Sequence, residues 1–387
     1  MKAVEIKDNI FWVGGIDWNL REFHGYKTQK GSTYNSYLLI DEKVVLVDTV
    51  KDYKYDEMLE RIKSVIDLSK IDYVVVNHVE MDHSGSLPEF LELVPNAKII
   101  TSQKGLDGLK IHYKQDFDAE IVSTGSTFNI GKRNLNFVQI PMVHWPDSMV
   151  TYIPEDKLLI PNDAFGQHIA SYERFDDELD LGIIMEQAAK YYANIVLPFG
   201  QQVQKALTVV GGLAIDMIAP SHGIIWRKNI SEIVSRYTAW ANNDTVRKAV
   251  IVYDSMWHST EKIAKSIYDA FEDKNIKAVL IDLKSSHISD AMTEVLDAEY
   301  ICVGSPTLNN NMLPTVASFL TYLKGLAPKD RKYLAFGSYG WGGQSVKQID
   351  EILSGMGFEK VIDPIRVNYV PSEDQLTEVK NLLTGLK

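Results

Sequence analysis

The chain has 387 residues, of which 45% are hydrophobic and 24% are charged, a balance typical of globular proteins and a length that suits two domains. The formal net charge of −12 argues against nucleic acid as a partner, because phosphate binding needs clusters of Lys and Arg. The only cysteine, Cys302, excludes an internal disulfide, a rubredoxin-type site and an iron–sulfur cluster held by this chain alone.

The N-terminal segment MKAVEIKDNIFWVGG lacks the apolar core of a signal peptide, so we expect a cytoplasmic protein. No apolar run is long enough to span a membrane, and we therefore expect no membrane partner. Because a cysteine site is excluded, any metal ion must be bound by His, Asp and Glu side chains.

Short apolar runs alternate with polar loops from residue 1 to residue 245, and we predict that these runs are buried strands of a first domain, 1–245. Spacing typical of amphipathic helices appears between some of them. The predicted strands cover 37–40, 44–50, 73–77, 97–101, 135–141, 157–161 and 214–220, and the predicted helices cover 54–67, 86–94 and 203–213.

The pattern changes near residues 241–248, and strands and helices then alternate regularly in a second domain, 246–387. This alternation predicts a doubly wound parallel sheet of flavodoxin-like size. The predicted strands cover 249–253, 277–282, 298–305 and 332–339, and the predicted helices cover 259–272, 313–325 and 344–356.

The most specific motif in the sequence is His-x-Glu-x-Asp-His at residues 78–83, directly after the predicted strand 73–77. Loops that follow buried strands are where such folds place chemistry. Three further candidates, His144, Asp163 and His222, each follow another predicted strand. The full set of candidate metal ligands is His78, Glu80, Asp82, His83, His144, Asp163 and His222.

Four imidazoles and three carboxylates exceed the four ligands of a mononuclear zinc site. They suit two metal ions bridged by one carboxylate, and the three carboxylates favour metals that accept hard oxygen donors, iron or manganese as well as zinc. A lone histidine after a strand is more often structural. The interpretation therefore depends on the motif at 78–83 and on the strand-end context that His144, Asp163 and His222 share.

This motif, followed at these spacings by His144, Asp163 and His222, resembles the flavodiiron protein family and, more broadly, the metallo-β-lactamase fold. The usual motif of that fold is His-x-His-x-Asp-His, and the resemblance implies that Glu80 in place of the second His marks iron instead of zinc. The implied fold class is α/β and α+β, with a metallo-β-lactamase-like αββα sandwich before the flavodoxin-like domain.

The resemblance also implies a role for each residue of the site. His24 is similar to a family histidine near the open coordination positions, and Tyr191 or Tyr192 would place a hydroxyl near bound substrate, although a buried core tyrosine is the alternative for each. In some family members the equivalent of His83 turns away from the metal. The implied ligands are His78, Glu80 and His144 for the iron nearer the flavin, Asp82, His83 and His222 for the other iron, and Asp163 between them.

Three loops at predicted strand ends of the second domain indicate FMN. Ser255, Ser259 and Thr260 precede or begin the predicted helix 259–272, whose N-terminus favours a phosphate, although a plain helix cap is the alternative. His258 stands where ordinary flavodoxins carry Gly, but the loop resembles the Ser-Met-Trp-x-Ser-Thr loop of flavodiiron proteins.

The loops 305–311 and 338–343 follow the third and fourth predicted strands of this domain. They add small residues that let the backbone approach a flat ring, while Trp341 can cover its face. The alternative is that Gly342 and Gly343 only form a turn between two elements. The residues expected around FMN are Ser255, Met256, Trp257, His258, Ser259, Thr260, Ser305, Pro306, Thr307, Leu308, Asn309, Asn310, Ser338, Tyr339, Gly340, Trp341, Gly342 and Gly343.

A flavin site fused to a two-metal site predicts redox chemistry, because a hydrolase has no use for a flavin. The resemblance implies reduction of dioxygen to water, of nitric oxide to nitrous oxide, or of both, with electrons from an external rubredoxin, reductase or reduced deazaflavin. It also implies a head-to-tail homodimer and leaves a tetramer open. The alternatives are a zinc hydrolase with a flavodoxin-like appendage and a flavin-only electron carrier.

Overall fold

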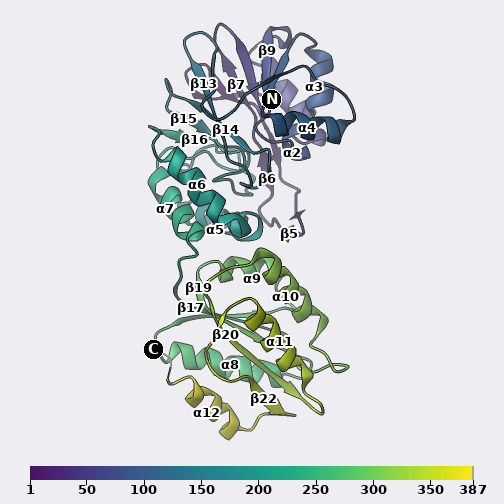
Figure 1. Ribbon diagram of the computed structural model, residues 1–387, viewed down its shortest axis with the longest axis vertical. Helices are drawn as coiled ribbons and strands as arrows, with labels where there is room; N and C mark the ends of the chain where they lie inside the picture. Colours follow the sequence, from purple (N-terminus) through teal and green to yellow (C-terminus); the bar gives the residue numbers. More distant parts are fainter. Residues whose placement is uncertain (386–387) are drawn as a thin grey trace. The chain divides into compact units, whose positions relative to one another are not determined.

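The computed structural model describes residues 1–385, which form two compact units (Figure 1). Unit 1 contains Met1–His24, Thr28–Tyr191 and Gln201–Thr238, and unit 2 contains Gly25–Lys27, Tyr192–Gly200 and the chain from Ala239 onward. No helix in residues 1–385 combines the length and the hydropathy that crossing a membrane requires.

Unit 1 contains two sheets whose facing sides share one hydrophobic core, so that Val45 and Val47 of the first sheet pack with Phe137 and Ile160 of the second. The first sheet has the order β1 (Val4–Lys7), β2 (Ile10–Trp12), β7 (Tyr37–Ile40), β8 (Val44–Val47), β9 (Ile71–Val75), β10 (Lys98–Thr101) and β11 (Ala119–Ile121). The second has the order β12 (Thr127–Asn129), β13 (Asn134–Gln139), β14 (Met149–Ile153), β15 (Leu158–Ile160) and β16 (Met217–Ile218).

Helices cover the outer face of each sheet. Leu38 and Leu46 point away from the shared core, because neighbouring residues of a strand face opposite ways, and they pack with side chains of α1 (Tyr55–Lys63), α3 (Leu87–Leu93) and α4 (Gln103–Tyr113). On the second sheet, α6 (Gly200–Val210) and α7 (Ile230–Ala241) lie over β14 and β15 (Figure 1). The four layers form the predicted αββα sandwich, and strands buried on both faces explain the unbroken apolar runs.

Unit 2 contains a parallel sheet in the order β18 (Lys277–Asp282), β17 (Val246–Tyr253), β19 (Ala298–Gly304), β20 (Lys332–Tyr339) and β21 (Glu359–Lys360), with β22 (Ile365–Asn368) also beside β20. The helices that alternate with these strands are α8 (Ser259–Glu272), α9 (Ile288–Val295), α10 (Pro314–Leu326), α11 (Gln344–Gly355) and α12 (Glu373–Leu382). This strand order is that of the flavodoxin-like doubly wound fold, as the sequence predicts.

Glu57 anchors α1 to the start of unit 1. Its carboxylate accepts hydrogen bonds from the backbone N–H of Ile16 at 3.2 Å, from Lys54 at 2.8 Å and from Arg61 at 3.3 Å. Burial by itself raises the pKa of Glu57, but the hydrogen bond from Lys54 and the other donors outweigh it, so the net pKa lies below the ordinary value. A carboxyl whose pKa is lower in the folded state stabilises the fold above its unfolded pKa, and this contribution disappears as the pH falls through the folded value.

We expect Glu57→Gln to lower the free energy of unfolding at pH 7 by about 1 kcal/mol, because the ion pairs are lost while the fold is kept. The difference from the unchanged protein should shrink below about pH 4, where the carboxyl of the unfolded chain is protonated. Urea unfolding of both proteins at pH 7 and near pH 3.5 measures it. An equal difference in unfolding free energy at both pH values would contradict a stabilising role for the ionised Glu57 carboxylate.

Candidate metal centre

The motif at 78–83 lies where β9 ends, and it curls into a single helical turn, α2 (Met81–Ser84). The carbonyl of Glu80 accepts hydrogen bonds from the N–H groups of His83 and Ser84, both at 2.9 Å. The Ser84 hydroxyl closes the same turn on the carbonyl of Val79 at 2.7 Å. This turn brings the two ends of the motif together, and the ring centroids of His78 and His83 lie 5.8 Å apart.

Asp48, at the end of β8, ties three strand-end loops to one another. Its buried carboxylate accepts the N–H of Asn77 at 2.8 Å, the side-chain amide of Asn77 at 3.2 Å and that of Asn162 at 3.1 Å. The side-chain oxygen of Asn77 accepts a hydrogen bond from Thr151 of β14 at 2.8 Å. The loops that carry the motif and Asp163 are therefore held in register by amide contacts that involve no candidate ligand.

All seven candidate ligands are buried in unit 1, and they form two groups whose ligand atoms lie within 4.8 Å of one another in each group. Asp163 faces both groups. Its Oδ2 lies 3.6 Å from His78 Nε2 and 3.5 Å from His144 Nε2, while its Oδ1 lies 3.0 Å from His83 Nε2 and 3.5 Å from His222 Nε2. The groups are His78, Glu80, His144 and Asp163, and Asp82, His83 and His222.

The donor atoms of this cluster fit metal ions. Within the described residues, both carboxylate oxygens of Asp82, Oδ2 of Asp163 and Nε2 of His222 are buried without a hydrogen-bond partner. Buried charged atoms that lack hydrogen bonds are costly even beside oppositely charged groups, and metal cations among them would reduce that cost. One carboxylate with an oxygen toward each histidine group is the arrangement that a pair of bridged ions needs.

The outer nitrogens of two histidines are held by polar groups around the cluster. His78 Nδ1 lies 2.9 Å from Oδ2 of Asp147, and His222 Nδ1 lies 2.7 Å from the carbonyl of Thr33. Such contacts fix the ring and direct the other nitrogen, Nε2, inward. His83 differs, because its Nδ1 has no hydrogen-bond partner among residues 1–385.

The charges of the cluster are strongly coupled to one another. Burial by itself lowers the pKa of His144, but Asp163 and Glu80 raise it to about 9. Burial likewise lowers the pKa of His83, and Asp82 and Asp163 raise it to about 9. Burial by itself raises the pKa of Glu80, which hydrogen bonds from His144 and His24 bring well below its ordinary range. Metal ions would replace these protons on the imidazoles.

Two of the three residues expected beside the metal site reach the carboxylates. His24 Nε2 lies 2.5 Å from Glu80 Oε1, and the His24 side chain is 40% exposed. The Tyr191 hydroxyl donates a hydrogen bond to Oδ1 of Asp163 at 3.0 Å. The ring of Tyr192 packs 5.2 Å from that of Trp240. Tyr191 is therefore the tyrosine that touches the cluster.

Sequence reasoning missed two polar residues around the ligands. Asp147, three residues after His144, accepts hydrogen bonds from the imidazole of His78 and from the N–H of Val79 at 2.8 Å. His168 is buried with its ring 4.7 Å from that of His222, and burial holds its pKa well below the ordinary value. The closeness of Asp147 to His144 in sequence was the one available signal, whereas no motif marks His168.

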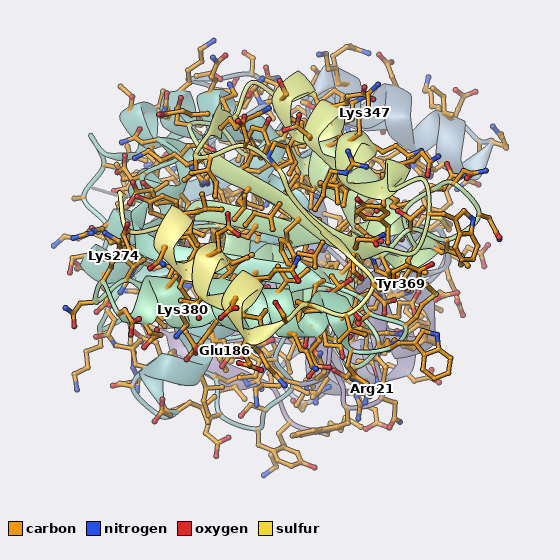
Figure 2. The ribbon with its side chains drawn as sticks, turned by 90° about the horizontal axis from the view of Figure 1, so that it is seen from below. Arg21, Glu186, Lys274, Lys347, Tyr369 and Lys380 are labelled. Carbon is orange, nitrogen blue, oxygen red and sulfur yellow. The ribbon has the colours of Figure 1, made fainter. Side chains whose placement is uncertain are left out.

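The loops predicted to hold FMN meet at a pocket of about 670 Å³ at the carboxyl edge of the sheet in unit 2. Tyr369, labelled in Figure 2, and Val370 also line it, and they were missed because they follow the short strand β22. The lining residues among those predicted are Met256, Trp257, Ser259, Pro306, Thr307, Leu308, Asn309, Asn310, Ser338, Tyr339, Gly340 and Trp341.

The remaining predicted residues belong to the same three loops but are not among the residues that line this pocket. Thr260 and Ser338 join their hydroxyls at 2.8 Å, and Gly342 and Gly343 take positive φ angles of 84° and 75° just before α11. The Ser255 hydroxyl is buried without a hydrogen-bond partner among the described residues, near the N-terminus of α8. A buried free hydroxyl near a helix N-terminus fits a phosphate group. Ser305 and His258 complete the loops, and His258 takes a φ of 64° as the residue before α8.

Known proteins match the chain over nearly its whole length. The family described as ODP family beta lactamase matches residues 33–223, and the flavodoxin family matches residues 251–381. The nitric oxide reductase of Moorella thermoacetica is 48% identical over 97% of this chain and 96% of its own. The rubredoxin-oxygen oxidoreductase of Megalodesulfovibrio gigas is 44% identical over 99% of this chain and 96% of its own.

Similarity to a solved structure identifies the family of this chain. The flavodiiron protein from Giardia intestinalis is 36% identical and superimposes with a TM-score of 0.97, over 100% of this chain and 96% of its own. This chain belongs to the flavodiiron protein family. The rubredoxin oxygen:oxidoreductase from Desulfovibrio gigas superimposes on the present chain with a TM-score of 0.96 at 44% identity. The match covers 99% of this chain and 97% of the other. The predicted resemblance is confirmed, and the names of these relatives favour an oxidoreductase over a zinc hydrolase.

We expect Asp147→Ala to weaken metal retention by about 10- to 100-fold, because the outer nitrogen of His78 loses the group that fixes its ring. Asp147→Asn keeps a side-chain oxygen as acceptor and should lose less. Metal content after dialysis against a graded chelator series measures the effect, with circular dichroism as the check of folding. Equal retention in the folded Asp147→Ala variant and the unchanged protein would show that Asp147 does not support the metal site.

Proposed function

We propose that this flavodiiron protein reduces dioxygen, nitric oxide or both at two iron ions held in unit 1, with electrons passed through FMN in unit 2. The observation that carries the proposal is Asp163, which presents one oxygen to each half of a buried cluster of imidazoles and carboxylates. The names of the relatives cover both gases, nitric oxide in one case and oxygen in another, and the proposal therefore covers both.

The ligand assignment follows the two groups of the cluster, with Asp163 shared between them. Glu80 Oε2 lies 3.3 Å from both His78 Nε2 and His144 Nε2, which supports a common metal for these three side chains. His222 Nε2 lies 3.1 Å from Oδ2 of Asp82, and His83 Nε2 lies 3.4 Å from its Oδ1. The proposed ligands are His78, Glu80 and His144 for one iron, Asp82, His83 and His222 for the other, and Asp163 for both.

When bound, the irons and FMN supply Lewis acidity and electrons, and the side chains of this chain supply orientation and protons. His24 holds a proton between its Nε2 and Glu80, and its partly exposed ring connects the cluster with solvent. Reduction of either gas to the proposed products consumes protons, so this is a suitable place for them to enter. Tyr191 holds Asp163 through its hydroxyl, which keeps both carboxylate oxygens directed at the two histidine groups.

The flavin pocket supports the choice of FMN and of an external electron donor. The loop around Ser255 offers a buried hydroxyl for the phosphate. Trp257 and Trp341 line the pocket of unit 2 and can cover the ring. We propose rubredoxin as the donor class, which the name of one relative supports, with a reductase or reduced deazaflavin as alternatives. A head-to-tail homodimer and a cytoplasmic location complete the proposal, and both rest on the resemblance and the sequence.

We expect the protein, once loaded, to contain two irons and one FMN per chain and to consume dioxygen or nitric oxide rapidly after anaerobic reduction. Asp163→Ala should lose iron and gas turnover but keep FMN and its rate of reduction, because the two sites are in different units. Metal analysis, the flavin spectrum and a gas electrode measure these quantities.

Asp116→Ala is the matched control, because Asp116 is an exposed carboxylate of unit 1 that pairs with Lys110 at 2.9 Å. It should leave iron content and gas turnover unchanged. Two zinc ions in place of iron, or full iron and FMN without turnover of either gas, would refute the proposed function.

A further inference from the structure

A small apolar cavity lies between the second sheet of unit 1 and the helices α6 and α7. Its volume is about 20 Å³, which is enough for one molecule of the size of water. Every side chain that lines it is aliphatic or aromatic, including Val150 and Leu159 from the sheet and Val203 and Ala206 from α6. The space is therefore sized for a single small molecule and is hydrophobic on all sides.

The lining of this cavity offers too few polar partners for a water molecule. The one polar side-chain atom among its lining residues is the hydroxyl of Tyr237, which already accepts a hydrogen bond from the N–H of Phe165 at 2.8 Å. A buried water molecule needs two to four polar partners, and dry apolar cavities bind xenon or hydrocarbons instead. A small apolar molecule, by contrast, gains free energy when it leaves water for such a space.

The inner wall of the cavity belongs to the loops that carry the metal site. Val143 directly precedes His144, and Ala164 and Phe165 directly follow Asp163. His144 and Asp163 face the metal cluster while their neighbours line the cavity. A molecule in the cavity is therefore next to the backbone that holds two of the proposed iron ligands.

The outer wall leads to the protein surface. A groove of about 610 Å³, lined in part by α7 and by the segment after α6, shares Phe165, Leu207 and Val210 with the cavity. Leu213 and Ile230 add further apolar surface to this groove. The same three side chains thus separate the small cavity from a much larger opening.

Phe165 is a fixed part of this partition. Its φ of 66° is a left-handed conformation that a bulky residue rarely adopts, and such backbone persists where its surroundings hold it. Its carbonyl accepts the indole N–H of Trp226 at 2.9 Å, and its ring packs 4.5 Å from that of Tyr237. Leu207 is only half-buried, so it is the member of the partition with room to move.

We propose that this cavity binds one small apolar gas molecule and that the groove and the cavity form a path for dioxygen or nitric oxide toward the metal cluster. The path rests on the proposed function, since it has a purpose only if a gas is the substrate. The cavity would raise the local concentration of the gas beside the ligands while admitting no water through the same space.

Crystals of the iron- and FMN-loaded protein pressurised with xenon test the site without any turnover. We expect a xenon peak in the cavity, and we expect Ala206→Leu, which fills the space, to remove it. In solution Ala206→Leu should raise the KM for the gas several-fold and leave kcat at saturating gas, iron content and the rate of flavin reduction unchanged. Lys205→Leu is the control, because this neighbouring residue of α6 is exposed and does not line the cavity.

Leu207→Ala provides a second test that does not overfill the core. It removes side-chain volume between the groove and the cavity, so xenon occupancy should rise and the KM for the gas should fall. Absence of xenon from the unchanged protein, or an unchanged KM in both folded variants, would overturn the proposed path while normal gas turnover leaves the proposed function standing. Xenon in the cavity of a loaded protein that turns over neither gas would overturn the proposed function and, with it, the path.

Discussion

Three carboxylates, Glu80, Asp82 and Asp163, are buried together in unit 1, and the organisation of the metal-binding face depends on how their charge is accommodated. Buried carboxylates are tolerated where cations or hydrogen-bond donors surround them. Here four imidazoles supply the partners, yet several carboxylate oxygens still lack a hydrogen bond in the described chain. The cluster is thus built for positive ions that bind between its two halves.

The residues that hold the loops of this cluster in place are different from the residues proposed to bind metal. Asp48 joins the loops after β8, β9 and β15 through the amides of Asn77 and Asn162, none of which is a proposed ligand. His78 and His222 are held at their outer nitrogens, whereas the outer nitrogen of His83 has no partner in residues 1–385. The imidazoles are therefore held unequally, since His78 and His222, unlike His83, have a polar partner at the outer nitrogen within the described chain.

The strand runs and the ligand motif could be predicted from sequence because they are local patterns. Buried parallel strands appear as short apolar runs, and the helix 259–272 was predicted with the bounds that α8 has. The helices not predicted are α2, α4, α5 (Leu181–Tyr191), α7, α9 and α12. Tertiary packing contributes more to the stability of most helices than their local sequence does. The assignment of Gly25–Lys27 and Tyr192–Gly200 to unit 2 also depends on contacts far apart in sequence.

The parts of the site that were missed also depend on the packed structure and not on local sequence patterns. Asp147 meets His78 across 69 positions of sequence, and no spacing rule connects the two. Tyr191 and Tyr192 are adjacent in sequence, and only their directions from the end of α5 (Leu181–Tyr191) separate the residue that reaches Asp163 from the one beside Trp240. Side-chain direction at a helix end depends on the packed structure and is not visible in a sequence motif.

The central claim is that Asp163 bridges two iron ions, and anomalous diffraction at the iron edge from crystals of the iron-loaded protein tests it most directly. The account predicts two iron peaks, one bound by Oδ1 of Asp163 with His83 and His222, the other bound by Oδ2 with His78 and His144. A single peak, peaks only at the zinc edge, or two irons without contact to Asp163 would contradict it.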